Sequence, residues 1–289
     1  MNSKFLSSLL ICFCCSSGLA QESPLILQEF QDAEDWAGWE QSGRERSGGE
    51  RPGEAEFTFV RGIYSNYLDS GSGFYRGPAG GWWQTDYDES ERNFLRGLKR
   101  YTTMDTSSYS YKALALTDSE LFEHTFLYIN MKRLPLLSGN GPNFKPEEAK
   151  AMREFMLKGG FVMLDDFWGP DHWNDFLIEL SKIFPDRELH ELPPSHPVFH
   201  SFFDIDEIPQ VPGRAVTWDY GSGFSIDDPE YPPSVHAILD DDERIMLVAN
   251  FNTDLGDGWE HTFYEAYPTE YCNEAYKLGI NFVVYAMSH

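Results

Sequence analysis

The sequence is poor in cysteine and has no long apolar run beyond its first twenty residues. It contains four cysteines in 289 residues, and three of them, Cys12, Cys14 and Cys15, lie close to the N-terminus. The remaining Cys272 cannot by itself form an internal disulfide or a cysteine-rich zinc site, so we interpret it as a small buried hydrophobic residue. No later apolar run reaches the roughly 20 residues that a transmembrane helix needs.

Basic residues are also scarce. Lysine and arginine together number 22 against 47 aspartates and glutamates, which gives a formal net charge of −25. Such an acidic surface repels phosphate backbones and anionic membranes, so we do not expect nucleic acid as a partner. The 41% hydrophobic content is that of a globular chain and excludes a disordered tail, a collagen-like fibre or a disulfide-stapled miniprotein.

The first twenty residues have the pattern of a secretory signal peptide. Lys4 precedes an apolar stretch from Phe5 to Cys15, and the small residues Gly18 and Ala20 precede Gln21. This pattern predicts cleavage after Ala20 and a mature protein in the periplasm or outside the cell. Two alternatives remain, a buried N-terminal helix and a lipoprotein signal, but no cysteine of this segment follows the small residue that lipidation requires.

The rest of the chain divides into a leader and one domain. Residues 21–56 include an acidic stretch rich in glycine and arginine, Trp39 to Glu54, which is typical of a flexible leader. From residue 57 to 289 short apolar runs alternate with helical patterns, which predicts a three-layer α/β domain with a mainly parallel sheet and helices on both faces. The expected strands are Phe57–Val60, Ala113–Leu116, Phe126–Ile129, Phe161–Leu164, Val235–Leu239 and Ile245–Phe251. The expected helices are Glu91–Arg100, Pro146 to Gly159, Pro170 to Phe184 with an inward stripe that includes Leu177, and Glu270–Met287.

Asp165 and Asp166 follow the most apolar of these strands. Parallel α/β sheets bind ligands beyond the carboxyl ends of their strands, so this pair is a candidate catalytic or binding position. Adjacent residues of a strand face opposite sides, so we expect only one of the two to line a crevice. In the alternative interpretation both carboxylates bind loop amides and the next helix N-terminus.

A second group of acidic residues follows the last strand. The segment 252–260 contains Asn252, Asp254 and Asp257 in a glycine-rich loop, where their oxygens are candidate ligands for Ca²⁺ or Mg²⁺, Asp254 and Asp257 above all. The alternative is a tight acidic turn. His196 is a candidate acid, base or ligand, although a loop histidine is more often structural.

We expect Asp166, His196 and the segment Asn252–Asp257 to converge at the carboxyl end of the sheet, with Trp83 and Trp168 as walls. Converging carboxylates repel one another, so a divalent cation, a hydroxyl-rich ligand or a protonated carboxylate would compensate them. The alternative is that these residues order separate loops. The sequence contains no Gly-x-Ser-x-Gly, P-loop, Gly-x-Gly-x-x-Gly or His-Glu-x-x-His motif.

Ordered blocks of the sequence resemble the DUF4159 family, a domain of unknown function. The resemblance runs from about Phe57 to the C-terminus. The blocks are Phe59-Val60-Arg61 with Tyr64, Trp83 with Thr85-Asp86-Tyr87, Leu116-Thr117-Asp118, Phe126-Leu127-Tyr128, Leu157 to Phe161, Asp165 to Gly169, His196-Pro197, Gln210-Val211-Pro212, Asn252 to Asp257 and Leu278 to Ala286.

The resemblance implies a flavodoxin-like sheet similar to class I glutamine amidotransferase domains. Those enzymes have a cysteine at the strand-to-helix turn where this chain has Asp165-Asp166-Phe167, so amidotransferase activity is not expected. Asp86 joins Trp83, Trp168, Asn252, Asp254 and Asp257 as an expected ligand-binding residue. The resemblance therefore implies a non-catalytic module that binds an envelope protein or a small polar ligand. The alternative is a hydrolase of a glycan or peptide, with Asp165 or Asp166 acting with His196.

Overall fold

The computed structural model describes residues 55–65, 81–132, 141–213 and 231–289. The expected signal peptide, residues 1–20, and nearly all of the expected leader, residues 21–56, lie outside the described residues. No helix in the described ranges combines the length and apolarity needed to cross a bilayer.

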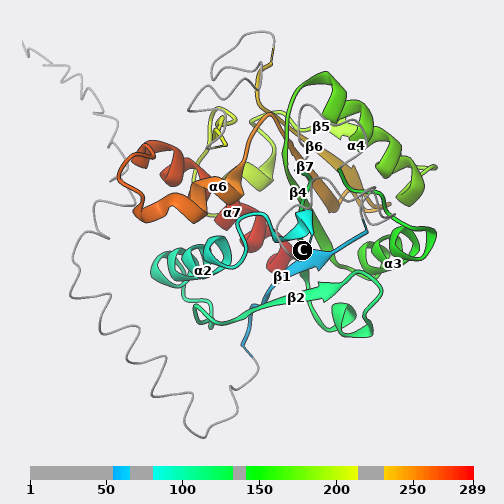
Figure 1. The fold of residues 1–289 in the computed structure, drawn as a ribbon, viewed down its shortest axis with the longest axis horizontal. Helices are drawn as coiled ribbons and strands as arrows, with labels where there is room; N and C mark the ends of the chain where they lie inside the picture. Colours follow the sequence, from blue (N-terminus) through cyan, green and yellow to red (C-terminus); the bar gives the residue numbers. More distant parts are fainter. Residues whose placement is uncertain (1–54, 66–80, 133–140, 214–230) are drawn as a thin grey trace, which may run out of the picture.

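A seven-stranded sheet with the order β2-β1-β3-β4-β7-β6-β5 forms the middle of the molecule (Figure 1). The first five strands in this order are parallel: β2 (Tyr111–Ala115), β1 (Phe59–Ile63), β3 (Phe126–Asn130), β4 (Phe161–Phe167) and β7 (Ile245–Phe251). The last two, β6 (Ser234–Leu239) and β5 (Leu189–Glu191), pair antiparallel. The predicted α/β fold with a mainly parallel sheet is confirmed, and the strand that begins at Phe161 is central.

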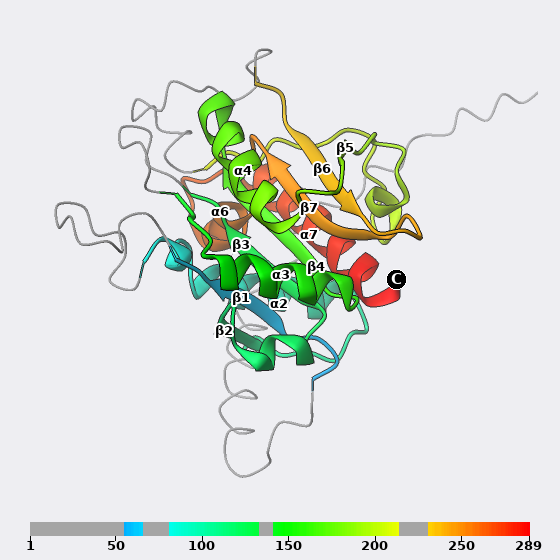
Figure 2. The same cartoon turned by 90° about the vertical axis from the view of Figure 1, so that its right-hand side faces the viewer.

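Helices cover both faces of the sheet, so the domain has three layers (Figure 2). One face is covered by α2 (Glu89–Tyr101), α6 (Leu255–Glu260) and α7 (Thr269–Ser288), and the other by α3 (Pro146–Leu157) and α4 (Gly169–Ile183). Within the described ranges, four short 3-10 helices lie in the connections: η3 (Trp82–Gln84), η4 (Ser119–Glu123), η5 (Pro197–His200) and η6 (His261–Phe263).

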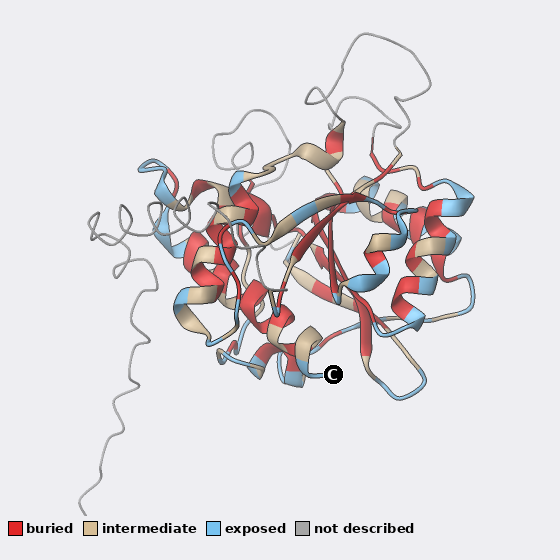
Figure 3. Ribbon diagram, turned by 90° about the horizontal axis from the view of Figure 1, so that it is seen from below, coloured by how far each residue is buried: buried red, intermediate tan, exposed pale blue. Residues whose placement is uncertain are grey.

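The strand sequences explain why both faces are covered. Every residue of β3 and of β4 is buried, and successive residues, in β4 as far as Leu164, alternate between the two helical layers. Tyr128 and Met163 pack toward α7, whereas Leu127 and Val162 pack toward α3. Such continuous apolar strands are typical of a parallel sheet buried on both sides. Figure 3 shows this buried sheet between helices that are exposed on their outer sides.

Three details of the fold differ from the sequence prediction. β2 lies at the edge of the sheet and is only partly buried, although its sequence resembles that of a buried strand. Leu177 faces outward and is 39% exposed, because Phe176, Leu180 and Ile183 form the buried side of α4. The expected acidic loop 252–260 contains helix α6, in which Leu255 and Trp259, four residues apart, are both buried.

Candidate functional site

Polar side chains gather at the carboxyl ends of three neighbouring strands. Asn130 is the last residue of β3, Asp165 and Asp166 lie near the end of β4, and Asn250 lies near the end of β7. All four are buried. Burial of uncompensated polar groups is costly, so each of these side chains needs partners at this end of the sheet.

A bulge in β4 directs both aspartates to the same place. Leu164 pairs with Ala249 and Phe167 with Phe251, so β4 contains one residue more than β7 over this stretch. Asp166 lies in this bulge, and its backbone is in the left-handed region, with φ 62°. The expectation that only one of the two lines a crevice assumed a regular strand, and that regularity is broken at Asp166.

Asp165 is a fully buried carboxylate of the group. It accepts hydrogen bonds from the Tyr128 hydroxyl at 3.0 Å, from the backbone N–H of Gly256 at 3.0 Å and from the Asn250 amide at 3.5 Å. Burial and the neighbouring Asp166 raise the pKa of Asp165 to about 7. Asp165 therefore joins β4 to the start of α6 and has most of its hydrogen-bonding capacity occupied by the protein.

Asp166 lies beside a lysine. Its Oδ2 is 3.1 Å from Lys132 Nζ and 3.4 Å from Asn130 Nδ2, and its Oδ1 accepts a 3.3 Å hydrogen bond from the indole N–H of Trp168. Burial raises the pKa of Asp166, and Lys132 opposes this shift. Trp168, expected as a wall of the site, is buried and bonded directly to the candidate carboxylate.

Asp86 reaches the cluster from the segment between η3 and α2. It has a left-handed backbone, with φ 64°, and its Oδ2 is 3.3 Å from the same Asn130 amide that contacts Asp166. Burial and Asp257 raise the pKa of Asp86 well above its usual value. Asp86 therefore belongs to the same electrostatic group as the β4 aspartates.

Arg61, on β1, holds the segment that contains Asp86. Its guanidinium is fully buried and donates hydrogen bonds to the carbonyls of Trp83 at 3.2 Å and Thr85 at 2.7 Å, and it forms an ion pair with Glu91. It also lies 4.6 Å from the centre of the Tyr128 ring. Arg61 therefore ties the Asp86 segment, helix α2 and the tyrosine that binds Asp165 into one unit.

Asp254 enters the cluster as the N-cap of α6. Its Oδ1 accepts a 2.9 Å hydrogen bond from the backbone N–H of Asp257. Its backbone N–H donates to Val211 at 2.8 Å, which anchors the segment. The other oxygen, Oδ2, is buried and receives no hydrogen bond from a donor in the described residues. Burial, Asp166 and Asp257 together raise the pKa of Asp254 well above its usual value.

Three of these carboxylates form a compact set of possible metal ligands. One oxygen each from Asp86, Asp166 and Asp254 lies within 4.8 Å of the others. Asp166 and Asp254 lie close enough that each affects the pKa of the other. With Asp165 and Asp257 nearby, five carboxylates face one paired ammonium, so fully ionised groups would leave an excess of four negative charges.

Two glycines leave room for these carboxylates. A Cβ on Gly256 would lie 2.6 Å from Asp86 Oδ2 and 2.8 Å from the Tyr128 hydroxyl. A Cβ on Gly213 would lie 2.9 Å from Asp254 Oδ2. These distances are shorter than a real Cβ contact, so a side chain at either position would displace the acidic groups.

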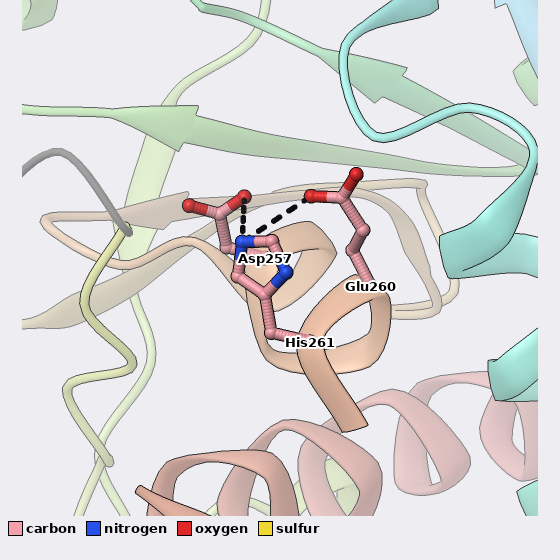
Figure 4. Close-up of side chains that lie close together, drawn as sticks. All are labelled: Asp257, Glu260 and His261. Carbon is pink, nitrogen blue, oxygen red and sulfur yellow. Dashed lines mark ion pairs between the residues drawn. The ribbon is translucent and has the colours of Figure 1, made fainter. Parts of the chain in front are cut away.

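A second acidic group adjoins the first at the end of α6. His261 Nε2 is 3.8 Å from Asp257 Oδ1 and 3.4 Å from Glu260 Oε2 (Figure 4). All three side chains come from one stretch of chain, α6 and the start of η6, and could also hold a metal ion. Asp257 interacts electrostatically with Asp86, Asp166 and Asp254, so the two groups are neighbours.

Some expected site residues have other roles in the structure. His196 is the N-cap of η5, where its Nδ1 accepts a 3.2 Å hydrogen bond from the N–H of Val198. Within the described residues it makes no hydrogen bond to a carboxylate, and η5 packs against α7. The Asn252 side-chain amide accepts a hydrogen bond from the backbone N–H of Gly169 and donates one to the carbonyl of Pro232. Trp83 packs against Tyr87, with ring centres 5.5 Å apart.

The sequence analysis missed several residues that complete the site. Asn130 is the last residue of β3, and Lys132 lies two residues beyond it. The positional rule that selected Asp165 and Asp166 would therefore also have selected these two residues. Arg61 and Asn250 are polar residues inside otherwise apolar strands, which is a recognisable signal of a buried partner. Glu91 has no such signal, because an acidic residue in the first turn of a helix is ordinary.

A family model described as a domain of unknown function, DUF4159, matches residues 67–287. The match therefore includes Asp86, Lys132, Asp165, Asp166 and Asp254. The chain matches no curated protein.

Proposed function

Because the chain belongs to the DUF4159 family, which is defined only as a domain of unknown function, we propose its function from the site itself. The proposal is an exported binding module of the cell envelope that takes a hard divalent cation, Ca²⁺ or Mg²⁺, in the buried carboxylate cluster. The observation that supports it most directly is the approach of Asp86, Asp166 and Asp254 to within 4.8 Å of one another.

The chemistry of the cluster favours a cation that prefers oxygen ligands. Ca²⁺ and Mg²⁺ bind carboxylate and carbonyl oxygens, with water completing the coordination. Three carboxylates from separate segments would supply the protein ligands, and the unbonded Oδ2 of Asp254 would gain a partner. The excess negative charge also makes the site selective for positive ligands. A small polar ligand of the module would complete the coordination of the ion.

A binding role agrees better with the geometry than the hydrolase alternative does. A hydrolase that uses Asp165 or Asp166 with His196 needs these groups within hydrogen-bond reach, directly or through one water. Burial lowers the pKa of His196, and its Nδ1 is occupied by the N–H of Val198. No contact of His196 within the described residues therefore supports a catalytic pair.

The topology supports a flavodoxin-like assignment of the fold. The parallel strands follow the order β2-β1-β3-β4, with β7 next, which corresponds to the flavodoxin-like order. We infer a relationship to amidotransferase-like domains without their chemistry. Cys272, on α7, is buried and its pKa is raised by burial, whereas Asp165 and Asp166 lie at the end of β4.

Cation binding is tested by calorimetry and thermal unfolding of EDTA-treated protein with added CaCl₂ or MgCl₂. We expect each salt to raise the melting temperature of the wild type, and the effect to be lost in Asp166→Asn and Asp254→Asn. The double variant should show a coupled, non-additive effect, because both residues contact one ion. Asp242→Asn, in the exposed β6–β7 turn, is the control. Additive effects and no response to either cation would overturn the proposal.

The envelope location has its own test. Mass spectrometry of the protein isolated from its native host should give a mature N-terminus at Gln21. Retention of Met1 in a cytoplasmic fraction would contradict export, and a lipid on one of the first cysteines would indicate an anchored form.

A further inference from the structure

Lys132 places a positive charge inside the carboxylate cluster. It lies two residues after Asn130, its side chain is only 26% exposed, and its Nζ is 3.1 Å from Asp166 Oδ2. Asp166 is one of the three carboxylates whose oxygens approach within 4.8 Å. Among the described residues, Lys132 is the basic side chain that forms an ion pair with this cluster.

We propose that Lys132 is a specificity-determining residue of the cation site, which excludes monovalent ions and admits divalent ones. The inference rests on the proposed function, because it concerns the same cluster. The ammonium already supplies one positive charge next to Asp166, so any ion that enters must either bind beside Lys132 or displace it.

Electrostatics makes the two classes of ion behave differently. A sodium or potassium ion that displaces the ammonium exchanges one unit charge for another, and it must also compete with a side chain tethered at the site. An ion that binds beside the ammonium is repelled by it. A divalent ion brings twice the charge, so its attraction to several carboxylates exceeds this repulsion.

The remaining groups of the cluster leave one carboxylate oxygen for such an ion to contact. Asp254 is fully buried, and its Oδ2 receives no hydrogen bond from a donor in the described residues. Asn130 reaches Asp86 and Asp166 through one amide, at 3.3 and 3.4 Å, so its donation is shared. Lys132 and Asn130 therefore compensate Asp166 and part of Asp86, while Asp254 Oδ2 is still without a donor.

The experiment removes or keeps the positive charge at position 132 and compares how different cations affect stability. The variants are Lys132→Met, Lys132→Gln and Lys132→Arg, with Lys112→Met as a control that removes a lysine from an exposed ion pair with Glu120. Melting temperatures are measured at about pH 8 in NaCl, KCl or choline chloride of equal ionic strength. Choline is too large for the cluster, so it reports the effect of ionic strength alone. Affinities for Ca²⁺ and Mg²⁺ are then measured by calorimetry.

We expect Na⁺ and K⁺ to stabilise Lys132→Met and Lys132→Gln relative to choline, and to have no such effect on the wild type, Lys132→Arg or Lys112→Met. We also expect at least about tenfold tighter divalent binding in the two neutral variants. Lys132→Gln keeps a hydrogen-bond donor, so it provides the result if Lys132→Met does not fold.

The possible results separate this inference from the proposed function. In one outcome the wild type binds Ca²⁺ or Mg²⁺, the neutral variants bind these ions no more tightly, and Na⁺ and K⁺ do not stabilise the neutral variants. The role of Lys132 is then refuted and the cation site stands. If only the neutral variants respond to ions, Lys132 excludes divalent as well as monovalent ions, so both its proposed selectivity and divalent binding by the wild type are refuted. If no variant responds to any cation, both proposals fail.

Discussion

Replacement of Asp254 by asparagine should stabilise the cation-free protein. The substitution keeps the shape of the side chain, and asparagine caps a helix about as well as aspartate, so the hydrogen bond from the N–H of Asp257 is retained. What changes is the charge, and the new amide can donate a hydrogen bond to Asp166. The variant therefore removes repulsion without removing a structural contact.

The magnitude follows from the spacing of the carboxylates. Two unit charges 4.8 Å apart, the limit within which the three oxygens lie, repel by about 3.5 kcal/mol at an effective dielectric constant of about 20. Asp254 faces both Asp86 and Asp166, but its raised pKa means that a proton relieves much of this repulsion. We therefore expect a gain of about 2 kcal/mol near pH 7, a little over half of the full repulsion of one such pair. For a domain of this size that is a rise in melting temperature of about 4–8 °C.

The effect should depend on pH in a defined direction. The folded pKa of Asp254 is above the value of about 3.9 in the unfolded chain, so the native state binds the extra proton. The contribution of Asp254 to the free energy of unfolding of the wild type is therefore present at low pH, and it is lost as the pH rises through the folded pKa. The advantage of Asp254→Asn should therefore be small near pH 4 and grow toward neutral pH.

Thermal unfolding in EDTA at several pH values measures this difference. Asp118→Asn is the matched control, because Asp118 is also an N-cap, of η4, but is exposed. It should change the melting temperature little at any pH. If Asp254→Asn were destabilising at every pH, the electrostatic reasoning would be refuted and Asp254 would be a structural cap.

Three further predictions test the surroundings of the site. Gly256→Ala should cost about 1–3 kcal/mol and abolish the response to divalent cations, because the new methyl group meets Asp86; thermal unfolding with and without CaCl₂ measures both effects. Arg61→Met should cost about 3–5 kcal/mol in urea unfolding, since it leaves Glu91 buried and unpaired, and the additional change Glu91→Gln should recover part of the loss. Burial raises the pKa of Cys272 to about 12, so this thiol should resist alkylation at about pH 8 in the native protein and react in urea; rapid labelling of the folded protein would contradict its burial.

Most of the fold could be predicted from the sequence because its strands are continuous apolar runs. Phe126–Asn130 and Phe161–Phe167 are buried on both faces. Strands buried in this way are composed largely of consecutive apolar residues, which are easy to recognise in a sequence. The short strand Leu189–Glu191 was missed because it has three residues and is largely exposed. Helix α6 was missed because its two glycines disfavour a helix, while the cap at Asp254 and the buried Trp259 stabilise it.

The site was less predictable, since it depends on contacts between distant segments. The positional rule for parallel sheets selected Asp165, Asp166 and Asp254. It did not indicate that Lys132 forms an ion pair with Asp166, because pairing depends on the register of β3 against β4. His196 was selected for its chemistry alone, and nothing in its local sequence distinguishes a ligand from a residue that caps a 3-10 helix.

Because of the bulge in β4, the residues that form the sheet are not the residue that supplies the carboxylate of the site. Leu164 and Phe167 pack on the same face, as they would if a single residue lay between them, so the hydrophobic alternation of the strand does not depend on Asp166. Deletion of one codon would restore continuous pairing with β7 and remove a carboxylate that contacts Lys132. A relative could therefore lose the proposed cation site in one evolutionary step and retain the architecture, so that a shared fold within the family does not guarantee shared chemistry.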